Sequence, residues 1–191
     1  MKALKDRIIA DGVAIGTEIV KVDSFLNHQI DVALLDEIGQ EFAKRFQGIE
    51  VSKILTVEAS GIAIACTTAK YFGNIPVLFA KKASPNTMTE GFYSAKVKSF
   101  TKGTVSDVRV SKKFLVPGDR VLILDDFLAH GEAAFGMAEL VRQANAELVG
   151  IGAVIEKQFQ GGGKRLREKG FLVESLAVIE SIQDGKINFL T

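Results

Sequence analysis

The chain has 191 residues, a formal net charge of +1 and one cysteine. Its hydrophobic fraction of 47% is ample for one sizeable core, and its charged fraction of 25% is typical of a soluble surface. The small net charge gives no reason to expect a nucleic-acid or membrane partner, and one cysteine excludes an internal disulfide. There is no targeting signal and no apolar stretch of roughly 18 residues. We therefore expect a single cytoplasmic domain, 1–191.

The first half of the chain predicts alternating helices and strands. Apolar residues spaced four apart form one stripe of an amphipathic helix, namely Ile30, Leu34, Ile38, Phe42 and Phe46. A strand follows over Lys53–Glu58, then a small-residue helix over Ile62–Phe72 and a second strand over Ile75–Ala80. Cys66 lies in an apolar run of this helix, where we expect it to be buried.

The second half continues the alternation around nearly continuous apolar runs. Arg120–Leu124 and Val149–Glu156 predict two buried strands, and Gly131–Asn145 predicts a helix between them. Residues 170–190 predict short strands with a turn at Asp184–Gly185. The pattern favours an α/β fold with a mainly parallel, twisted sheet covered by helices on both faces.

The segment 81–113 differs from its surroundings because it is long and basic. It holds eight Lys/Arg residues against two Asp/Glu residues, a net charge of +6. Alternating residues at Ala95–Ser99 and Val105–Ser111 predict a two-stranded hairpin. A long excursion in a compact domain favours a flexible functional lid, although a solvated charged face is an alternative.

Two adjacent acids follow the strand Arg120–Leu124 and precede a loop that enters a helix. Asp125 and Asp126 lie at the carboxyl end of the strand, where ligands bind in sheets of this kind. The loop contains Ala129, His130, Gly131, Glu132 and Ala133. Its N–H groups suit an anion, whereas the carboxylates suit sugar hydroxyls or Mg²⁺. A phosphorylated sugar would satisfy both, and helix capping alone would explain only one of the two acids.

The stretch "VLILDDFLAHGEAA" resembles the phosphoribosyl-diphosphate (PRPP) signature of the type I phosphoribosyltransferases. The resemblance implies their fold, with a hood built from 1–30 and 157–191. It also implies that Asp125 and Asp126 contact the ribose and that Ala129 to Ala133 hold the 5-phosphate. Where many members carry threonines, this chain has His130 and Ala133.

Further segments resemble the short bacterial xanthine phosphoribosyltransferases, among them "KVDSFLNHQID", "ASGIA", "SFTKG", "GIGAVIEKQFQ" and "VESLA". This family transfers the phosphoribosyl group of PRPP to xanthine, and its members are usually homodimers. The alternatives left open are a guanine or hypoxanthine transferase and a PRPP-sensing regulator that binds nucleic acid. The regulator is disfavoured because the chain has no spare residues for a DNA-binding module.

The resemblance also implies roles around the leaving diphosphate. Ala59, Ser60 and Gly61 match the diphosphate loop, but adenine-specific relatives carry an arginine at the position of Ser60. The missing cation is expected from the basic segment, where Lys81, Lys82 and the hairpin near Lys98–Lys102 would close over bound PRPP. Among these, Lys81 is the candidate for the PRPP site. Mg²⁺ is expected to arrive with PRPP, held by its phosphates and by Asp125 or Asp126, because no His/Cys cluster has metal-ligand spacing.

Base recognition is implied at three positions, Val20, Asn27 and Lys157. Phe127 is the candidate for stacking on the purine, with Phe159 as a second choice, and a place in the hydrophobic core is the alternative for each ring. An asparagine side chain offers both a donor and an acceptor to an oxopurine. "GGGK" at Gly161–Lys164 departs from a P-loop, since Gln158 and Arg165 replace two of its required residues. We expect this stretch to be a surface turn.

Overall fold

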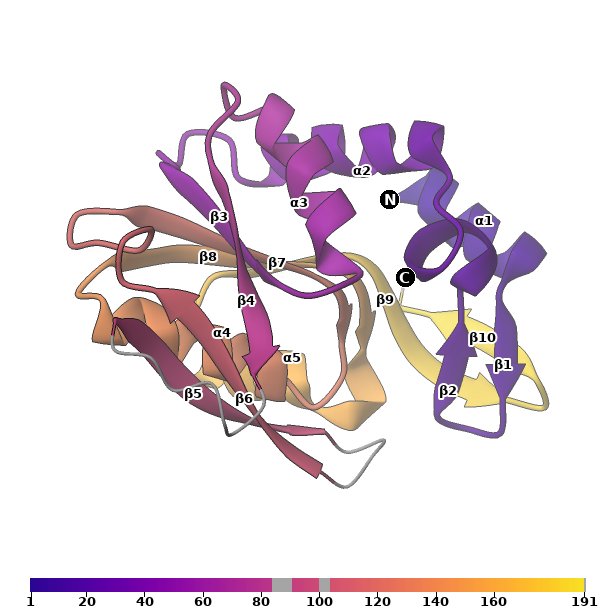
Figure 1. The fold of residues 1–191 in the computed structure, drawn as a ribbon. Coiled ribbons are helices and arrows are strands. Elements are labelled where there is room, and N and C mark those ends of the chain that lie inside the picture. Colours follow the sequence, from indigo (N-terminus) through magenta and orange to yellow (C-terminus); the bar gives the residue numbers. More distant parts are fainter. Residues whose placement is uncertain (84–90, 100–103, 191) are drawn as a thin grey trace.

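A computed structural model describes residues 1–83, 91–99 and 104–190. Eight strands form one sheet in the order β10-β9-β8-β7-β3-β4-β6-β5 (Figure 1). Their bounds are β3 Lys53–Val57, β4 Val77–Ala83, β5 Phe92–Ser99, β6 Thr104–Ser111, β7 Arg120–Leu128, β8 Glu147–Lys157, β9 Val173–Gln183 and β10 Lys186–Phe189. The inner strands from β9 to β4 are parallel, and antiparallel strands extend the sheet at both ends. The expected mainly parallel sheet is confirmed.

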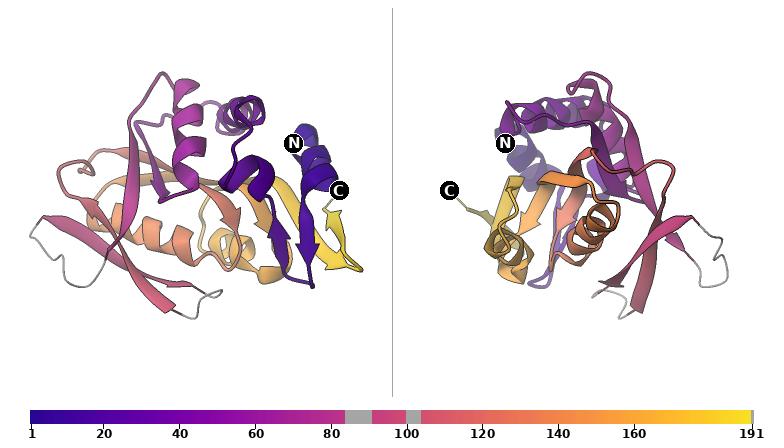
Figure 2. Two further views of the ribbon diagram at one scale, coloured as in Figure 1. Left: turned by 45° about the vertical axis from the view of Figure 1, so that its right-hand side comes forward. Right: turned by 90° about the vertical axis from the view of Figure 1, so that its left-hand side faces the viewer.

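Helices cover both faces of the sheet, as predicted. The helices are α1 Lys2–Asp11, α2 Val32–Arg45, α3 Gly61–Lys70, α4 Glu132–Gln143 and α5 Gly162–Glu168. Figure 2 shows α2 and α3 on one side of the central strands and α4 on the other. In β7, Leu122 and Leu124 belong to the core on the α2–α3 side, while Val121 and Ile123 belong to the core on the α4 side. Alternate residues of one strand therefore fill two cores.

The segments near the two ends of the chain lie at the same end of the molecule (Figure 1). A small antiparallel ribbon joins β1 Val13–Ile15 to β2 Ile19–Lys21, and a π-helical turn over Asp23–Asn27 follows it. The hood expected from 1–30 and 157–191 remains a prediction as a functional unit. No helix in the described part of the chain is long and apolar enough to cross a membrane.

The predicted hairpin forms and joins the main sheet. β5 and β6 pair along eight residues each, and β6 continues onto β4 through Arg109–Lys81 and its neighbours. Ala95 and Val108 are buried in the α4-side core. The strands of this segment are therefore part of the fold, while 84–90 and 100–103 lie outside the described residues.

Several local expectations are corrected. α2 begins at Val32, so Ile30 lies outside the helix with 40% of its surface exposed. Cys66 is exposed rather than buried, because it lies on the outer side of α3 between buried Ala65 and Ala69. β9 is one strand of eleven residues rather than several short ones. The expected turn at Asp184–Gly185 is confirmed, with both residues at positive φ.

The triglycine stretch is not a surface turn. Gly162 and Gly163 are buried in the first turn of α5, and Gly161 precedes it in a left-handed conformation with φ of 78°. A Cβ on Gly162 would overlap the backbone of the loop that follows β7, and one on Gly163 would overlap Glu156. Close packing therefore explains Gly162 and Gly163, and the positive φ explains Gly161.

Candidate functional site

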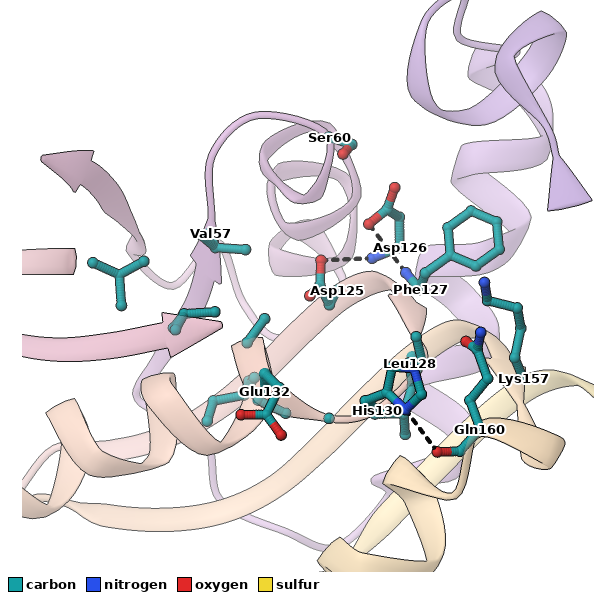
Figure 3. Close-up of a pocket in the computed structure, with 18 of the residues that line it drawn as sticks. Val57, Ser60, Asp125, Asp126, Phe127, Leu128, His130, Glu132, Lys157 and Gln160 are labelled. Atoms are coloured by element: carbon teal, nitrogen blue, oxygen red, sulfur yellow. Dashed lines mark hydrogen bonds between the residues drawn. The ribbon is translucent and has the colours of Figure 1, made fainter. Parts of the chain in front are cut away.

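A cavity of about 620 Å³ opens beyond the carboxyl ends of β3, β7 and β8 (Figure 3). It is lined by the loops after β3 and β7, by Lys157 at the end of β8, and by residues of the β1–β2 turn and the hairpin. Parallel strands place their carboxyl ends along one edge, which is where open α/β sheets bind ligands. Segments distant in sequence therefore converge on one cavity.

The two acids lie on β7 itself, because the strand runs on to Leu128 instead of ending before them. Asp125 Oδ1 accepts the N–H of Asp126 at 2.9 Å, and Asp126 Oδ1 accepts the N–H of Phe127 at 3.0 Å (Figure 3). Burial raises the pKa of the Asp125 carboxyl well above its ordinary value, the charge of Asp126 raises it further, and Lys82 opposes both. The two adjacent carboxyl groups therefore destabilise the folded protein unless a cation or a set of hydroxyl donors binds them.

The loop after β7 leads directly into α4. Gly131 adopts a left-handed conformation with φ of 86°, and the helix begins at Glu132. The N–H groups in the first turn of a helix have no partner within the helix, and they carry the positive end of its dipole. All five predicted phosphate-loop residues line the cavity, namely Ala129, His130, Gly131, Glu132 and Ala133. The structure thus brings this loop and the two carboxylates to one cavity, and anion binding by the loop stays a prediction.

The loop after β3 forms another wall of the cavity. Ala59 and Ser60 line it, and the peptide bond before Ala59 is cis. Gly61 does not line the cavity; it is buried at the start of α3, where a Cβ would overlap the hydroxyl of Thr56. Its lack of a side chain therefore lets α3 begin close to β3.

Lys82, rather than Lys81, lines the cavity. The Lys82 N–H donates to Glu58 Oε1 at 2.6 Å, which ties β4 to the loop after β3. The Lys81 ammonium instead lies 5.9 Å from the centre of the Phe79 ring. Neighbouring strand residues point to opposite faces, so a shift of one position in the pleat exchanges the two lysines.

Lys157 and Phe127 approach each other on the opposite wall (Figure 3). The Lys157 ammonium lies 5.8 Å from the centre of the Phe127 ring and donates to the Glu18 carbonyl at 3.1 Å. Burial lowers the pKa of Lys157, and the charge of Glu18 partly opposes this. The carbonyl and the ring together fix an ammonium group at the cavity wall.

The remaining predicted base residues, Val20 and Asn27, are not among the described residues that line the cavity. Val20 is buried, and its neighbours Glu18 and Ile19 line the cavity in its place. Asn27 Nδ2 donates to Asp126 Oδ2 at 3.2 Å, so the segment expected to form the hood contacts the acidic pair directly. The sequence contained no signal for Glu18, because Glu18 contacts Lys157 through its backbone carbonyl and any residue type has one.

The donor set of the cavity suits a magnesium ion carried by a diphosphate. Mg²⁺ prefers carboxylate, phosphate and water oxygens, and Asp125 and Asp126 supply two carboxylates. Among the described residues, no group of three or more His, Cys, Asp or Glu side chains is arranged to hold a metal ion. Asp125 and Asp126 are the residues that would hold such an ion together with the diphosphate.

Comparisons with known proteins agree with this geometry. Residues 21–180 match the family described as "Phosphoribosyl transferase domain". The chain is 56% identical to a xanthine phosphoribosyltransferase of Clostridium novyi over 99% of both chains. It is 53% identical to a protein of the same name from Clostridioides difficile, covering 99% of this chain and 100% of that one.

Solved structures of lower identity share the fold. An adenine phosphoribosyltransferase from Rhodothermus marinus has a TM-score of 0.72 at 22% identity, covering 93% of this chain and 99% of that one. An adenine phosphoribosyltransferase from Saccharomyces cerevisiae has a TM-score of 0.71 at 20% identity, covering 92% and 99%. The fold is that of the type I phosphoribosyltransferases, and the chain belongs to the phosphoribosyltransferase family. Within it, the full-length relatives named above are xanthine phosphoribosyltransferases.

Proposed function

We propose that this protein is an enzyme that transfers the 5-phosphoribosyl group of PRPP to xanthine, giving xanthosine 5'-monophosphate and diphosphate in purine salvage. One observation carries the proposal: an acidic pair and a helix-entry loop face the same cavity, and they are complementary to the two halves of a phosphorylated ribose. Full-length identities of 50% or more to xanthine phosphoribosyltransferases support the choice of base.

The sugar is assigned to the β7 edge. The N–H groups of residues 129–133 would bind the 5-phosphate, and Asp125 and Asp126 would accept hydrogen bonds from the ribose hydroxyls. As the bond from ribose C1 to diphosphate breaks, the ribose becomes cationic. The two nearby carboxylates would then stabilise it electrostatically, which fits the raised pKa of Asp125 in the absence of a cation.

The leaving diphosphate is assigned to the loop after β3. Backbone N–H groups of Ala59 and Ser60 would face it, with Gly61 shaping the loop from behind. We assign the missing cation to Lys82, since this lysine lines the cavity, whereas Lys81 was the candidate from the sequence. A magnesium ion bound to the diphosphate would neutralise its developing charge, and Asp125 or Asp126 could hold that ion through water.

The base is assigned to the wall formed by Lys157, Phe127 and the β1–β2 turn. The Phe127 ring offers a surface on which a purine can stack, and the adjacent ammonium can donate to a purine carbonyl. Val20 would shape this wall from behind, and Asn27 would offer its amide to the purine edge. A cation here favours xanthine because this oxopurine ionises readily, so a partly negative base meets a positive charge.

Three broader properties belong to the proposal. The enzyme is a single domain, it is a homodimer, and it works in the cytoplasm with PRPP and xanthine as its partners. The family resemblance supports the dimer, and the single cysteine favours a reducing compartment. The segment 81–113 acts as a lid, with Val97 and Lys98 already at the cavity wall.

A steady-state assay of diphosphate release with PRPP, Mg²⁺ and each of four bases tests the function. We expect xanthine to give the highest kcat/KM of xanthine, guanine, hypoxanthine and adenine. Preference for guanine or hypoxanthine would assign a different purine to the same site. Binding of PRPP without release of diphosphate with any base would instead support a PRPP-sensing regulator.

A further inference from the structure

The segment between β8 and β9 lies directly behind the phosphate loop. It consists of the short helix η2, Gln158–Gln160, and of α5. The Gly162 N–H donates to the Ala129 carbonyl at 3.0 Å, and the Gln160 carbonyl lies 3.1 Å from His130 Nδ1 (Figure 3). Two separate loops are thus joined by contacts that leave no room for a side chain at Gly162.

Arg165 of α5 adds further contacts to the same loop. Its Nη1 donates to the His130 carbonyl at 3.0 Å and to Glu132 Oε1 at 2.9 Å. Its guanidinium carbon also lies 5.0 Å from the centre of the Phe135 ring, one turn into α4. Arg165 is absent from the residues that line the cavity, so it contacts the loop from behind.

These contacts determine the direction of two consecutive peptide groups. A trans peptide is planar, so its C=O and the following N–H point in opposite directions. Because Gly162 holds the Ala129 carbonyl and Arg165 holds the His130 carbonyl, the N–H groups of His130 and Gly131 point away from α5. Preorganised donors of this kind bind an anion without first paying an ordering cost.

α5 is itself fixed to the sheet by an ion pair whose carboxylate is buried and whose guanidinium is partly exposed. Arg167 donates from Nη1 and Nη2 to the two carboxylate oxygens of Glu156, at 2.9 and 2.8 Å, and Ser175 donates to the same carboxylate. Glu156 is 2% exposed and directly precedes Lys157 at the end of β8. These contacts therefore hold α5 against β8 and β9, behind the phosphate loop.

We propose that Arg165 is a positioning residue for binding of the 5-phosphate of the substrate, with Gly162 as its backbone counterpart. This inference rests on the proposed function and adds two residues that do not line the cavity. Arg165 acts through the loop peptides and through Glu132, and it does not contact the substrate. Losing it should weaken the hold on the phosphate of ribose 5-phosphate and leave the diphosphate loop, on the other side of the acidic pair, unchanged.

The test is calorimetric titration of two separate probes, ribose 5-phosphate and magnesium diphosphate, into the full chain. Arg165→Met removes the contacts, and Lys164→Met is the matched control. Lys164 is the adjacent residue of α5 with a side chain that is 80% exposed, so its replacement removes the same charge. Arg165→Lys keeps the charge and can rescue in part. Steady-state assays of the same variants give KM for PRPP and for xanthine.

For Arg165→Met we expect binding of ribose 5-phosphate and KM for PRPP to worsen about tenfold, the size of one lost charge-assisted hydrogen bond. Magnesium diphosphate affinity and KM for xanthine should stay within about twofold of wild type, as should all four values for Lys164→Met. Arg165→Lys should give values between those of wild type and Arg165→Met. If the methionine variant is insoluble, Arg165→Lys is compared with wild type in its place.

Two results would overturn the inference. Arg165→Met could bind ribose 5-phosphate as tightly as Lys164→Met does, or it could lose both probes equally, which would indicate general damage to the fold. A wild-type protein that binds neither probe and does not turn over PRPP would instead refute the proposed function, and the inference with it.

Discussion

At the residue scale, Asp125 and Asp126 show how a ligand site departs from the rules of a stable fold. Their charges repel each other, and burial raises the pKa of Asp125. When the folded-state pKa of a carboxyl is raised, the folded state holds the proton more tightly than the unfolded state does. The protein therefore loses stability as pH rises from the unfolded-state pKa of that carboxyl through its folded-state pKa. The pair therefore makes the ligand-free protein less stable at neutral pH and ready to accept cationic or hydroxyl partners.

Lys157 offers a test of base selectivity at this scale. We expect Lys157→Ala to reduce kcat/KM with xanthine by about tenfold to a hundredfold, the cost of one charged hydrogen bond. The loss with guanine should be smaller, because guanine carries an amino group in place of one xanthine carbonyl. Parallel assays with both bases measure the difference.

Lys186→Ala provides the control for that comparison. Lys186 is exposed on β10, so its loss removes one positive charge without altering the cavity wall. An equal loss with both bases in the Lys157 variant would argue against a role in choosing between them.

The sequence placed several predicted site residues at the cavity, while their roles stay predictions. The acidic pair, the phosphate loop, Lys157 and Phe127 all reach the cavity. Which of Lys81 and Lys82 faces the cavity depends on which strand residues point to that face of the sheet, and a shift of one residue reverses this pattern. Arg165 could not be found because its partners lie 35 and 33 residues away and one of them is a backbone carbonyl, which any residue type supplies.

At the scale of elements, the buried strands were predictable because both their faces are covered. β7 has apolar residues at four consecutive positions, and each face meets a different core. The triglycine stretch was not predictable in this way. Glycine in a sequence indicates a turn or a close approach, and only the tertiary packing against Glu156 and Ala129 distinguishes the two.

The Glu156–Arg167 pair gives a stability prediction for α5. Burial acts to raise the pKa of Glu156, but the hydrogen bonds from Arg167 and Ser175 outweigh it and lower that pKa. Arg167→Met would leave the buried carboxylate with Ser175 as its remaining partner. We expect it to cost about 2 kcal/mol of unfolding free energy at neutral pH, less than for a fully buried pair because the Arg167 side chain is 43% exposed. Urea unfolding measures this loss.

The same variant has a pH signature. A depressed carboxyl pKa contributes stability above the unfolded-state value of about 4.3, and this contribution is lost as pH falls through the folded-state pKa. The difference in unfolding free energy between wild type and Arg167→Met should therefore become smaller at acidic pH. Arg142→Met is the control for the size of the loss, since Arg142 forms an exposed pair with Glu139 and its replacement should cost far less stability than that of Arg167. A difference in unfolding free energy that does not change with pH would contradict the proposed role of the Glu156–Arg167 pair.

At the scale of the whole molecule, the site is an assembly of segments that no single motif contains. The loops after β3 and β7, the end of β8, the β1–β2 turn and the hairpin all contribute to one cavity. Strand order places β3, β7 and β8 side by side, so their carboxyl ends meet. The sequence predicted this convergence because buried parallel strands end at a common edge, but it could not predict how the hood segments fit together.

The proposed lid makes a prediction at this scale. Limited proteolysis within residues 84–105 should slow at least severalfold when PRPP and Mg²⁺ are present, because closure over the ligand would shield these bonds. Mass spectrometry of the fragments locates the cuts. Cleavage at Lys169 on the surface after α5 serves as the internal control, and equal protection at both places would point to general stabilisation rather than closure.

The paired acids on β7 are the part of the site on which every assignment depends, and one measurement tests them most directly. Diphosphate release from PRPP and xanthine is compared between wild type and the double variant Asp125→Asn/Asp126→Asn, with thermal unfolding to verify that both are folded. We predict that kcat/KM falls by at least about a hundredfold while the double variant stays folded. Turnover at the wild-type rate would contradict the account.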